Sequence, residues 1–392
     1  MPNTPLQFLA VRRNAASHPR SHARAGATIV GAWFPTPLPS DRQVAMVEPR
    51  GDMTPQFDRP PKVTFAFTET CNQECRHCYA DCGRKRKRRE LSTDEWLKLI
   101  DYLAENGVIQ TYIEGGEPLH RPDFLKILRH TSRRMMTLLR TNGTLIDAAM
   151  ARRLKRAGVG HVLVDLMGCS AETHDWFAGV AGSFTRACAG IRNLVEAGVK
   201  TDVLTILNRR NASEMQAILD LAHGLGAERV GVLRLYPLGP VKHRWSDLAL
   251  SLDEQMAAIA TLKPPAGLKL MQSWHPRDRN CCWQSATVNA YGDSIGCPYL
   301  REYVNFGNVR DTPFMEIWDT DPLYRTLRTG EVESSCSTCD ANEGSRGGCR
   351  SAAYAFRGRW NAADPFCPTV NDGVDLRVLP DWIFQAKPRA PT

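Results

Sequence analysis

The sequence predicts an α/β protein built as a partial (β/α)6 TIM-like barrel, followed by a cysteine-rich C-terminal extension. Between residues 60 and 262, six short apolar runs alternate with amphipathic stretches, a pattern typical of repeated βα units around a parallel sheet. Beyond residue 262 the pattern changes to short strands, turns and cysteines. We therefore expect four segments: an N-terminal extension (1–57), the barrel (58–265), the cysteine-rich extension (266–375) and a C-terminal tail (376–392).

The first segment contains many Pro, Arg and Ala residues, and its first forty positions carry no Asp or Glu. This composition predicts a poorly ordered extension. An organelle-targeting peptide has a similar composition. An over-long gene start, with Met46 or Met53 as the true first residue, also fits, and the sequence leaves these alternatives open.

The predicted strands of the barrel follow one another along the chain. They are VTFAF (63–67), VIQTYIE (108–114), MMTLLR (135–140), HVLVDLM (161–167), KTDVLTIL (200–207) and RVGVLRLY (229–236). The first helix between them begins with a capping box formed by Ser92 and Glu95. Right-handed crossovers curl such a sheet into a full or partial barrel, and loops at the carboxyl ends of its strands form the active face. In the extension, ATVNAYGDSIGCPY predicts a hairpin, and TPFMEIWDTDPLYRTLRTG predicts one or two helices.

The composition limits the classes of function. No apolar run approaches the roughly 18–20 residues of a membrane helix, so we expect no membrane partner. The thirteen cysteines are not preceded by a secretory signal, which predicts a cytoplasmic protein that binds metal through thiols. The formal charge is +8, with a basic block at residues 84–89. This block fits a solvated loop or a docking patch for an acidic peptide or a carboxylate-rich molecule. No nucleic-acid-binding module accompanies it.

The first cysteine group lies in CNQECRHC (71–78), directly after the first predicted strand. Three thiolates within so short a loop can hold a small inorganic centre without closing its coordination. A [4Fe–4S] cluster has four irons, so Cys71, Cys75 and Cys78 would leave one iron without a protein ligand. That iron is where chemistry could take place.

A structural zinc site is the alternative for this loop. Zinc in such sites takes four protein ligands, commonly as two separated pairs. His77 or Cys82 could complete a zinc knuckle. The helix-breaking Gly83 and the basic block, however, predict that Cys82 lies past the cluster loop.

A strand followed by C-x3-C-x2-C resembles the signature of the radical S-adenosylmethionine (SAM) enzymes. IEGGEPL (113–119) ends the second strand and resembles the GGEP motif of that family, which receives the methionine amino group of SAM. The matching residues are Gly115, Gly116, Glu117 and Pro118. RTNGTL (140–145) closes the third strand, where the family places polar contacts to SAM, so Thr141 and Asn142 are candidates. The resemblance covers residues 60 to about 370.

The resemblance implies a mechanism. The open iron would chelate SAM, and one electron, supplied by a reductase with flavodoxin or ferredoxin, would cleave its sulfonium bond to give a 5′-deoxyadenosyl radical. The radical would abstract a hydrogen atom from the substrate. Relatives often read VSLDG at the fourth strand, where this chain reads VDLMG (164–168). Asp165 is therefore a candidate catalytic residue, with a more apolar pocket around Met167 as the alternative. Cys169 is a candidate hydrogen donor, although a buried structural thiol fits it too.

The later cysteines resemble the SPASM extension of this superfamily, a twitch-like domain that binds auxiliary [4Fe–4S] clusters beside the barrel. The matching residues are Cys282, Cys297, Cys336, Cys339, Cys349 and Cys367. Ser345 stands where the family usually has one further cysteine, and Pro276 stands where it has another, with Cys281 as an uncertain substitute.

The missing cysteines leave the number of auxiliary clusters open. One cluster would use Cys282, Cys297 and Cys349, and the other Cys336, Cys339 and Cys367, so each is one cysteine short. Two clusters could still form if the iron without a cysteine stayed open or took an oxygen ligand such as Ser345 or Asp340. A single cluster would use Cys282, Cys297, Cys336 and Cys339, and zinc is the structural alternative.

Three short segments of the sequence indicate the class of substrate. SAETHDWFAGVAGSF, FGNVRDTPFMEIW and GGCRSAAYAFRGRWNAADPFC are similar to segments of members that modify haem precursors and of members that modify ribosomal peptides. We expect an enzyme that acts in the biosynthesis or maturation of a tetrapyrrole or other cofactor. The alternatives are a peptide maturase, an oxidase or epimerase of a small secondary metabolite, and a non-catalytic iron–sulfur electron carrier.

Overall fold

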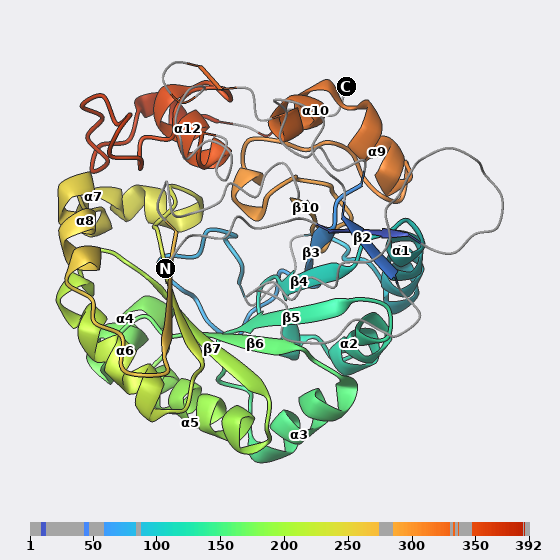
Figure 1. The fold of residues 1–392 in the computed structure, drawn as a ribbon, viewed down its shortest axis with the longest axis horizontal. Helices are drawn as coiled ribbons and strands as arrows, with labels where there is room; N and C mark the ends of the chain where they lie inside the picture. The colour runs from blue at the N-terminus through green and yellow to red at the C-terminus, as the bar shows by residue number, and fades with distance from the viewer. Residues whose placement is uncertain are drawn as a thin grey trace.

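The computed structural model describes residues 59–83, 88–273, 285–329, 332–333, 336, 347–386 and 388, together with the backbone of 9–12 and 43–46. Figure 1 shows a curved sheet with helices along its outer side, and the C-terminal helices α9, α10 and α12 beyond one end of it.

Eight parallel strands form the sheet, in the order β10-β3-β4-β5-β6-β7-β8-β9. Their bounds are β3 Lys62–Ala66, β4 Gln110–Glu114, β5 Met136–Thr141, β6 His161–Asp165, β7 Lys200–Ile206, β8 Arg229–Leu233, β9 Lys269–Gln272 and β10 Ser285–Val288. Strands β3 to β8 are the six predicted strands, which confirms the partial (β/α)6 barrel. Because β9 pairs with β8 and β10 pairs with β3, the sheet continues past the predicted boundary at residue 265.

Helices connect the strands and cover the outer side of the sheet (Figure 1). The barrel helices are α1 Thr93–Glu105, α2 Phe124–Ser132, α3 Ala148–Ala157, α4 Ala171–Ala178, α5 Ser183–Glu196, α6 Met215–Gly224, α7 Trp245–Leu248 and α8 Leu252–Ala260. The capping box predicted for the first helix is present, since the Ser92 hydroxyl accepts from Glu95 N and the Glu95 carboxylate accepts from Ser92 N.

At the predicted hairpin the chain turns back after β10, but its returning side pairs with β10 only through an isolated antiparallel bridge between Val288 and Ser294, and the segment predicted to hold one or two helices holds two. Asn289 N donates to Asp293 O, which closes the turn after β10. The helices are α9 Phe314–Thr320, α10 Pro322–Thr329 and α12 Arg350–Arg357, with short 3-10 turns that include η4 Pro298–Leu300. Near the N-terminus, β1 Leu9–Arg12 pairs antiparallel with β2 Gln43–Met46. No helix in the described part of the chain is both long and apolar enough to cross a membrane.

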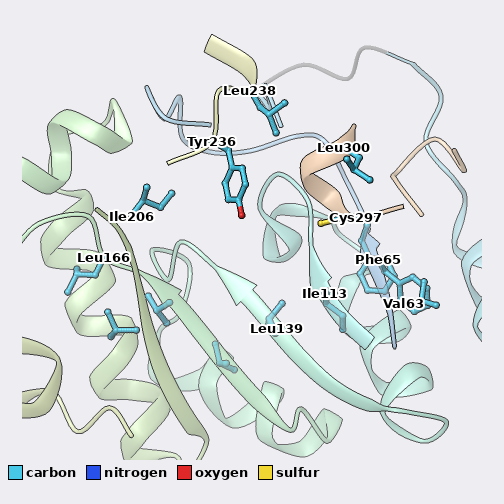
Figure 2. Close-up of a cluster of buried hydrophobic side chains, with 14 of the residues drawn as sticks. Val63, Phe65, Ile113, Leu139, Leu166, Ile206, Tyr236, Leu238, Cys297 and Leu300 are labelled. Atoms are coloured by element: carbon cyan, nitrogen blue, oxygen red, sulfur yellow. The ribbon is translucent and has the colours of Figure 1, made fainter. Parts of the chain in front are cut away.

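One apolar core joins the barrel to the extension. Strand residues such as Phe65, Ile113 and Leu139 are fully buried, and their neighbours along most strands are buried as well, because helices cover the outer side of this parallel sheet. Cys297 and Leu300 of the extension belong to the same cluster (Figure 2). The C-terminal cysteines are therefore carried by a segment that packs on the barrel.

Candidate active site

The cluster loop, residues 67–83 after β3, is held on two sides by backbone hydrogen bonds. Cys71 N donates to Gly83 O at 2.8 Å, which closes the loop on itself. Arg76 N donates to Phe177 O at 2.9 Å, which ties its middle to the C-terminal end of α4. These bonds fix the path of the loop over the carboxyl ends of the strands.

Cys71, Cys75 and Cys78 line one cavity. Burial raises the pKa of the Cys71 thiol to about 12 and holds that of Cys75 well above its usual range. The pKa of Cys78 is lowered to about 6 by the hydrogen bond with the Cys82 thiol. Because burial penalises thiolates, a centre that binds all three must supply positive charge.

The structure corrects the expectation for Cys82. Its side chain lines the same cavity, and its backbone N–H lies 3.4 Å from the Cys78 sulfur. The cause is a bridge between Thr70 and Gly83, which returns the chain to the start of the loop instead of leading it away.

The donor set fits an iron–sulfur cluster better than a single metal ion. Among the described residues, no three His, Cys, Asp or Glu side chains converge closely enough to hold one ion. His77, the candidate fourth zinc ligand, has a pKa lowered to about 3 by burial, and its Nδ1 finds no partner among the described residues. Spaced thiols around one cavity are instead the arrangement that a cluster with several irons requires.

The predicted glycine platform packs directly against the cluster loop. A Cβ atom on Gly115 would lie 2.3 Å from Thr68 O, and one on Gly116 would lie 2.1 Å from Thr70 O. Gly116 N in turn donates to Thr68 O at 2.6 Å. Only glycine permits this approach, and both glycines line the cavity.

Glu117 and Pro118 follow the two glycines and are not among the residues that line the cavity. The Glu117 carboxylate is fully buried and accepts from Thr141 Oγ1 and Asn142 N, both at 2.8 Å. Burial raises its pKa to about 7. Thr141 and Asn142 themselves line the cavity, and the Asn142 amide lies 3.9 Å from the Cys71 sulfur. Glu117 thus positions the residues that face the cavity.

Charged residues from three neighbouring strands also line this cavity. Arg140 on β5 contacts Asp165 on β6, with Nε 3.0 and 3.1 Å from the two carboxylate oxygens. On β4, Glu114 accepts a hydrogen bond from the Tyr79 hydroxyl at 2.5 Å. Burial raises the pKa of both carboxyl groups, and Arg140 opposes this effect. The Asp165 side chain remains 24% exposed, so it can accept a hydrogen bond from a ligand.

Sequence reasoning missed Arg140, Glu114 and Tyr79. Two signals for residues that point into the barrel were available in the sequence. Tyr112 and Glu114 lie two positions apart on one strand, and Arg140 stands at the end of the next strand, in RTNG. His174 was also missed. Its Nδ1 accepts from Met167 N at 3.2 Å, so the other ring nitrogen carries the proton. Burial lowers its pKa to about 4, which keeps this cavity-lining ring neutral.

The structure does not bring Cys169 into the cavity. It lies after the end of β6, and its backbone N–H donates to Glu214 Oε2 at 2.8 Å. Burial and Glu214 raise the pKa of its thiol. Met167, by contrast, lines the cavity beside Asp165.

The described C-terminal cysteines fall into two places. Cys297 and Cys349 precede η4 and α12, and these two elements are joined by a hydrogen bond from Ser351 Oγ to Tyr299 O at 2.5 Å. Cys336 and Cys367 are buried in a small separate apolar cluster. The predicted ligands Cys282 and Cys339, with Cys281, Ser345, Asp340 and Pro276, lie outside the described residues.

Asp364 connects these cysteines to the barrel. Its carboxylate contacts Arg234, which follows β8, at 2.7 Å and accepts from Cys349 N at 2.8 Å. Its own carbonyl accepts from Cys367 N at 3.0 Å. Both charged side chains of the Arg234–Asp364 pair are fully buried.

Comparisons with known proteins agree with this geometry. The profile of the Radical SAM superfamily matches residues 65–222, and that of the SPASM iron–sulfur cluster-binding domain matches residues 281–340. An AdoMet-dependent heme synthase of Methanosarcina barkeri is 30% identical, with 80% of this chain and 98% of the relative covered. A PqqA peptide cyclase of Granulibacter bethesdensis is 28% identical, with 85% and 96% covered.

Solved structures show the same fold. Streptococcus suis SuiB bound to S-adenosylmethionine superposes with a TM-score of 0.65 at 16% identity, covering 79% of this chain and 78% of SuiB. This chain matches both family models, and it matches relatives over nearly their whole length. It is therefore an enzyme whose cofactors are [4Fe–4S] clusters and SAM. The chain belongs to the radical SAM superfamily and carries a SPASM extension.

Proposed function

We propose that this enzyme abstracts a hydrogen atom from an unactivated carbon of a tetrapyrrole or another cofactor precursor bound inside the barrel. The observation that carries the proposal is that three thiols, a glycine platform and a buried guanidinium, Arg140, share one cavity. When bound there, the reduced cluster and SAM supply the 5′-deoxyadenosyl radical.

The residues of the cavity divide these tasks. Cys71, Cys75 and Cys78 hold the cluster. Gly115 and Gly116, with Thr141 and Asn142, carry SAM, because all four line the cavity beside the three thiols. Glu117 positions Thr141 and Asn142 by accepting their hydrogen bonds, and Pro118 begins the turn that follows.

Arg140 and Asp165 receive polar groups of the substrate. A guanidinium binds carboxylates such as propionates strongly. The Asp165 side chain, which is 24% exposed, accepts hydrogen bonds from the substrate. The likeness to a heme synthase along nearly its whole length favours a tetrapyrrole as the first substrate to test.

A ribosomally made peptide is the second candidate. The PqqA peptide cyclase matches a comparable length of this chain, and SuiB has also been solved bound to its precursor peptide SuiA. Inside the cavity, the carboxyl groups of Glu114 and Asp165 face one guanidinium. This excess of carboxyl groups over guanidinium groups favours a substrate group that donates hydrogen bonds, as peptide amides do.

The C-terminal cysteines serve auxiliary clusters. Oxidation that begins with hydrogen abstraction leaves one electron on the substrate radical, and a cluster beside the barrel can accept it. We assign Cys297 and Cys349 to one site, with Cys282, and Cys336 and Cys367 to the other, with Cys339. The electron for SAM cleavage comes from a flavodoxin or ferredoxin with its reductase.

An anaerobic assay tests the proposal. Purified, reconstituted enzyme is mixed with dithionite and SAM, and 5′-deoxyadenosine is measured by mass spectrometry. We expect its formation to rise when iron coproporphyrin or another tetrapyrrole is added, and deuterium from a labelled substrate to enter it. A rise with precursor peptides alone would select the second candidate. No 5′-deoxyadenosine from protein with full iron and sulfide content would refute the radical function.

A further inference from the structure

Two arginines flank one tryptophan beside the cluster loop. The Cζ atoms of Arg76 and Arg210 lie 4.8 and 4.4 Å from the ring centroid of Trp176. Arg76 stands between Cys75 and Cys78 in the sequence, Trp176 belongs to α4, and Arg210 is exposed after β7. None of the three lines the cavity, so a substrate bound inside the barrel does not use them.

The two arginines form no ion pair with the acidic side chains around them, as far as the structure describes the chain. Asp175 accepts from Gly182 N and Phe184 N, both at 2.7 Å, and Glu214 accepts from the Thr173 hydroxyl. Stacking on the Trp176 ring holds each cation, and Arg76 Nη1 also donates to Trp176 O, but two like charges on one ring repel each other. An anionic partner would relieve this repulsion.

Aromatic rings lead from this surface to the cluster ligands. Trp176 packs edge to face on Phe177, with centroids 4.8 Å apart, and Phe177 packs on His77 at 5.5 Å. His77 is the residue directly before Cys78. The backbone bond from Arg76 N to Phe177 O joins the same two segments. The surface is therefore in direct contact with the loop that holds the cluster.

We propose that Arg76, Trp176 and Arg210 form the docking surface for an acidic one-electron carrier protein of the flavodoxin or ferredoxin type. The carrier loses one electron, and the cluster held by Cys71, Cys75 and Cys78 gains it through the contacts of Trp176, Phe177 and His77; no atom is transferred. The inference rests on the proposed function, because only a reducible cluster at this loop makes use of such a surface.

Charge reversal at Arg210 tests the docking surface. Formation of 5′-deoxyadenosine is measured at low ionic strength with increasing concentrations of purified flavodoxin, kept reduced by its reductase and NADPH, and separately with dithionite. In Arg210→Glu we expect the half-saturating flavodoxin concentration, and the dissociation constant of flavodoxin measured directly by isothermal titration calorimetry, both to rise roughly tenfold, because the reversed charge repels an acidic carrier. The rate with dithionite stays at the wild-type value, since this small reductant needs no docking.

Three further variants distinguish an effect of charge on docking from an effect of a damaged fold. Arg153→Glu reverses a charge that is also exposed, on α3, and should leave the flavodoxin dependence unchanged. Arg76→Gln should weaken docking as Arg210→Glu does. Glu74→Gln removes the exposed acid on the same loop and should lower the half-saturating concentration, an effect that a damaged fold does not produce.

The outcomes are distinct. An unchanged half-saturating concentration in Arg210→Glu overturns the inference. A loss of rate that is equal with flavodoxin and with dithionite also overturns it, because the residue then supports the site itself. Wild-type enzyme that is silent even with dithionite contradicts the proposed function, which is a different result.

Discussion

The two cysteine regions of this enzyme differ in how the chain brings its ligands together. The barrel draws Cys71, Cys75 and Cys78 from one short loop, which is hydrogen-bonded to itself at Gly83 and to the end of α4. The extension draws its described cysteines from positions between 297 and 367, at the starts of η4 and α12 and in a small apolar cluster.

This difference concerns the free energy of assembling each site. Closing a short loop that the barrel already holds costs little further chain entropy. Ligands that are far apart in sequence must instead be brought together, and metal binding then contributes directly to folding. We infer that the barrel site is preorganised, whereas the extension depends on its clusters for its structure.

Replacing one cysteine in each region should give the largest contrast. In Cys75→Ala, we expect the loss of about four irons per chain and of essentially all 5′-deoxyadenosine formation, with the circular dichroism spectrum unchanged. In Cys336→Ala, we expect iron loss with most SAM cleavage retained, but with substrate turnover lost. Cys188→Ala, a buried cysteine of α5, is the control. Equal loss of SAM cleavage in both variants would contradict independent sites.

Removal of the clusters should separate the two regions physically. After chelation of iron under oxidising conditions, we expect the amides of β4 to β7 to keep their protection from hydrogen exchange, because this core is apolar and fully packed. The amides around α12 and Cys367 should exchange faster by orders of magnitude. Hydrogen exchange with mass spectrometry measures both regions in one sample. Equal loss of protection in the barrel would show that its site is not preorganised.

The buried pair of Arg234 and Asp364 should couple the regions most strongly. Asp364→Ala removes the carboxylate that neutralises the buried Arg234 guanidinium, a loss that typically costs about 3–5 kcal/mol of unfolding free energy. It also removes the acceptor of Cys349 N, so auxiliary iron should fall as well. Urea unfolding and iron analysis measure the two effects. Glu333→Gln breaks the exposed pair with Arg359 and should change stability by about 0–1 kcal/mol.

Gly116 tests the preorganised platform on a smaller scale. The Cβ atom of Gly116→Ala would meet Thr70 O at 2.1 Å, so the backbone must shift, at a cost of about 1–3 kcal/mol. We expect SAM to bind more weakly while the iron content stays near the wild-type value. Equilibrium dialysis with labelled SAM measures the affinity. Gly224→Ala, where an added Cβ has nothing within 4 Å, should bind SAM normally.

The same contrast explains how much the sequence could predict. The strands of the barrel and the cysteine loop follow local patterns, so strands such as 161–167 and the motif around Gly115 were predictable. The edge pairing of β10 with β3 was not, because it joins segments that are more than 200 residues apart and no local pattern encodes it. The ring position of His174 depends on a hydrogen bond to Met167, and Arg234 meets Asp364 across 130 positions. These contacts exist only in the folded chain.

Cys82 shows where prediction from neighbouring residues in the sequence fails. Its replacement should also have the smallest effect on the enzyme. The glycine and the basic block after it predicted an exit from the loop, but the bridge between Thr70 and Gly83 turns the chain back. Cys82→Ala keeps the backbone N–H near the Cys78 sulfur and removes only the thiol contact. Hydrogen bonds to cluster sulfurs tune the reduction potential, so their loss should shift the midpoint slightly negative. Iron content and 5′-deoxyadenosine formation should persist, and an EPR-monitored redox titration measures the shift. A variant that lacks one iron would instead make Cys82 a fourth ligand, and the barrel site would then have no open corner for SAM.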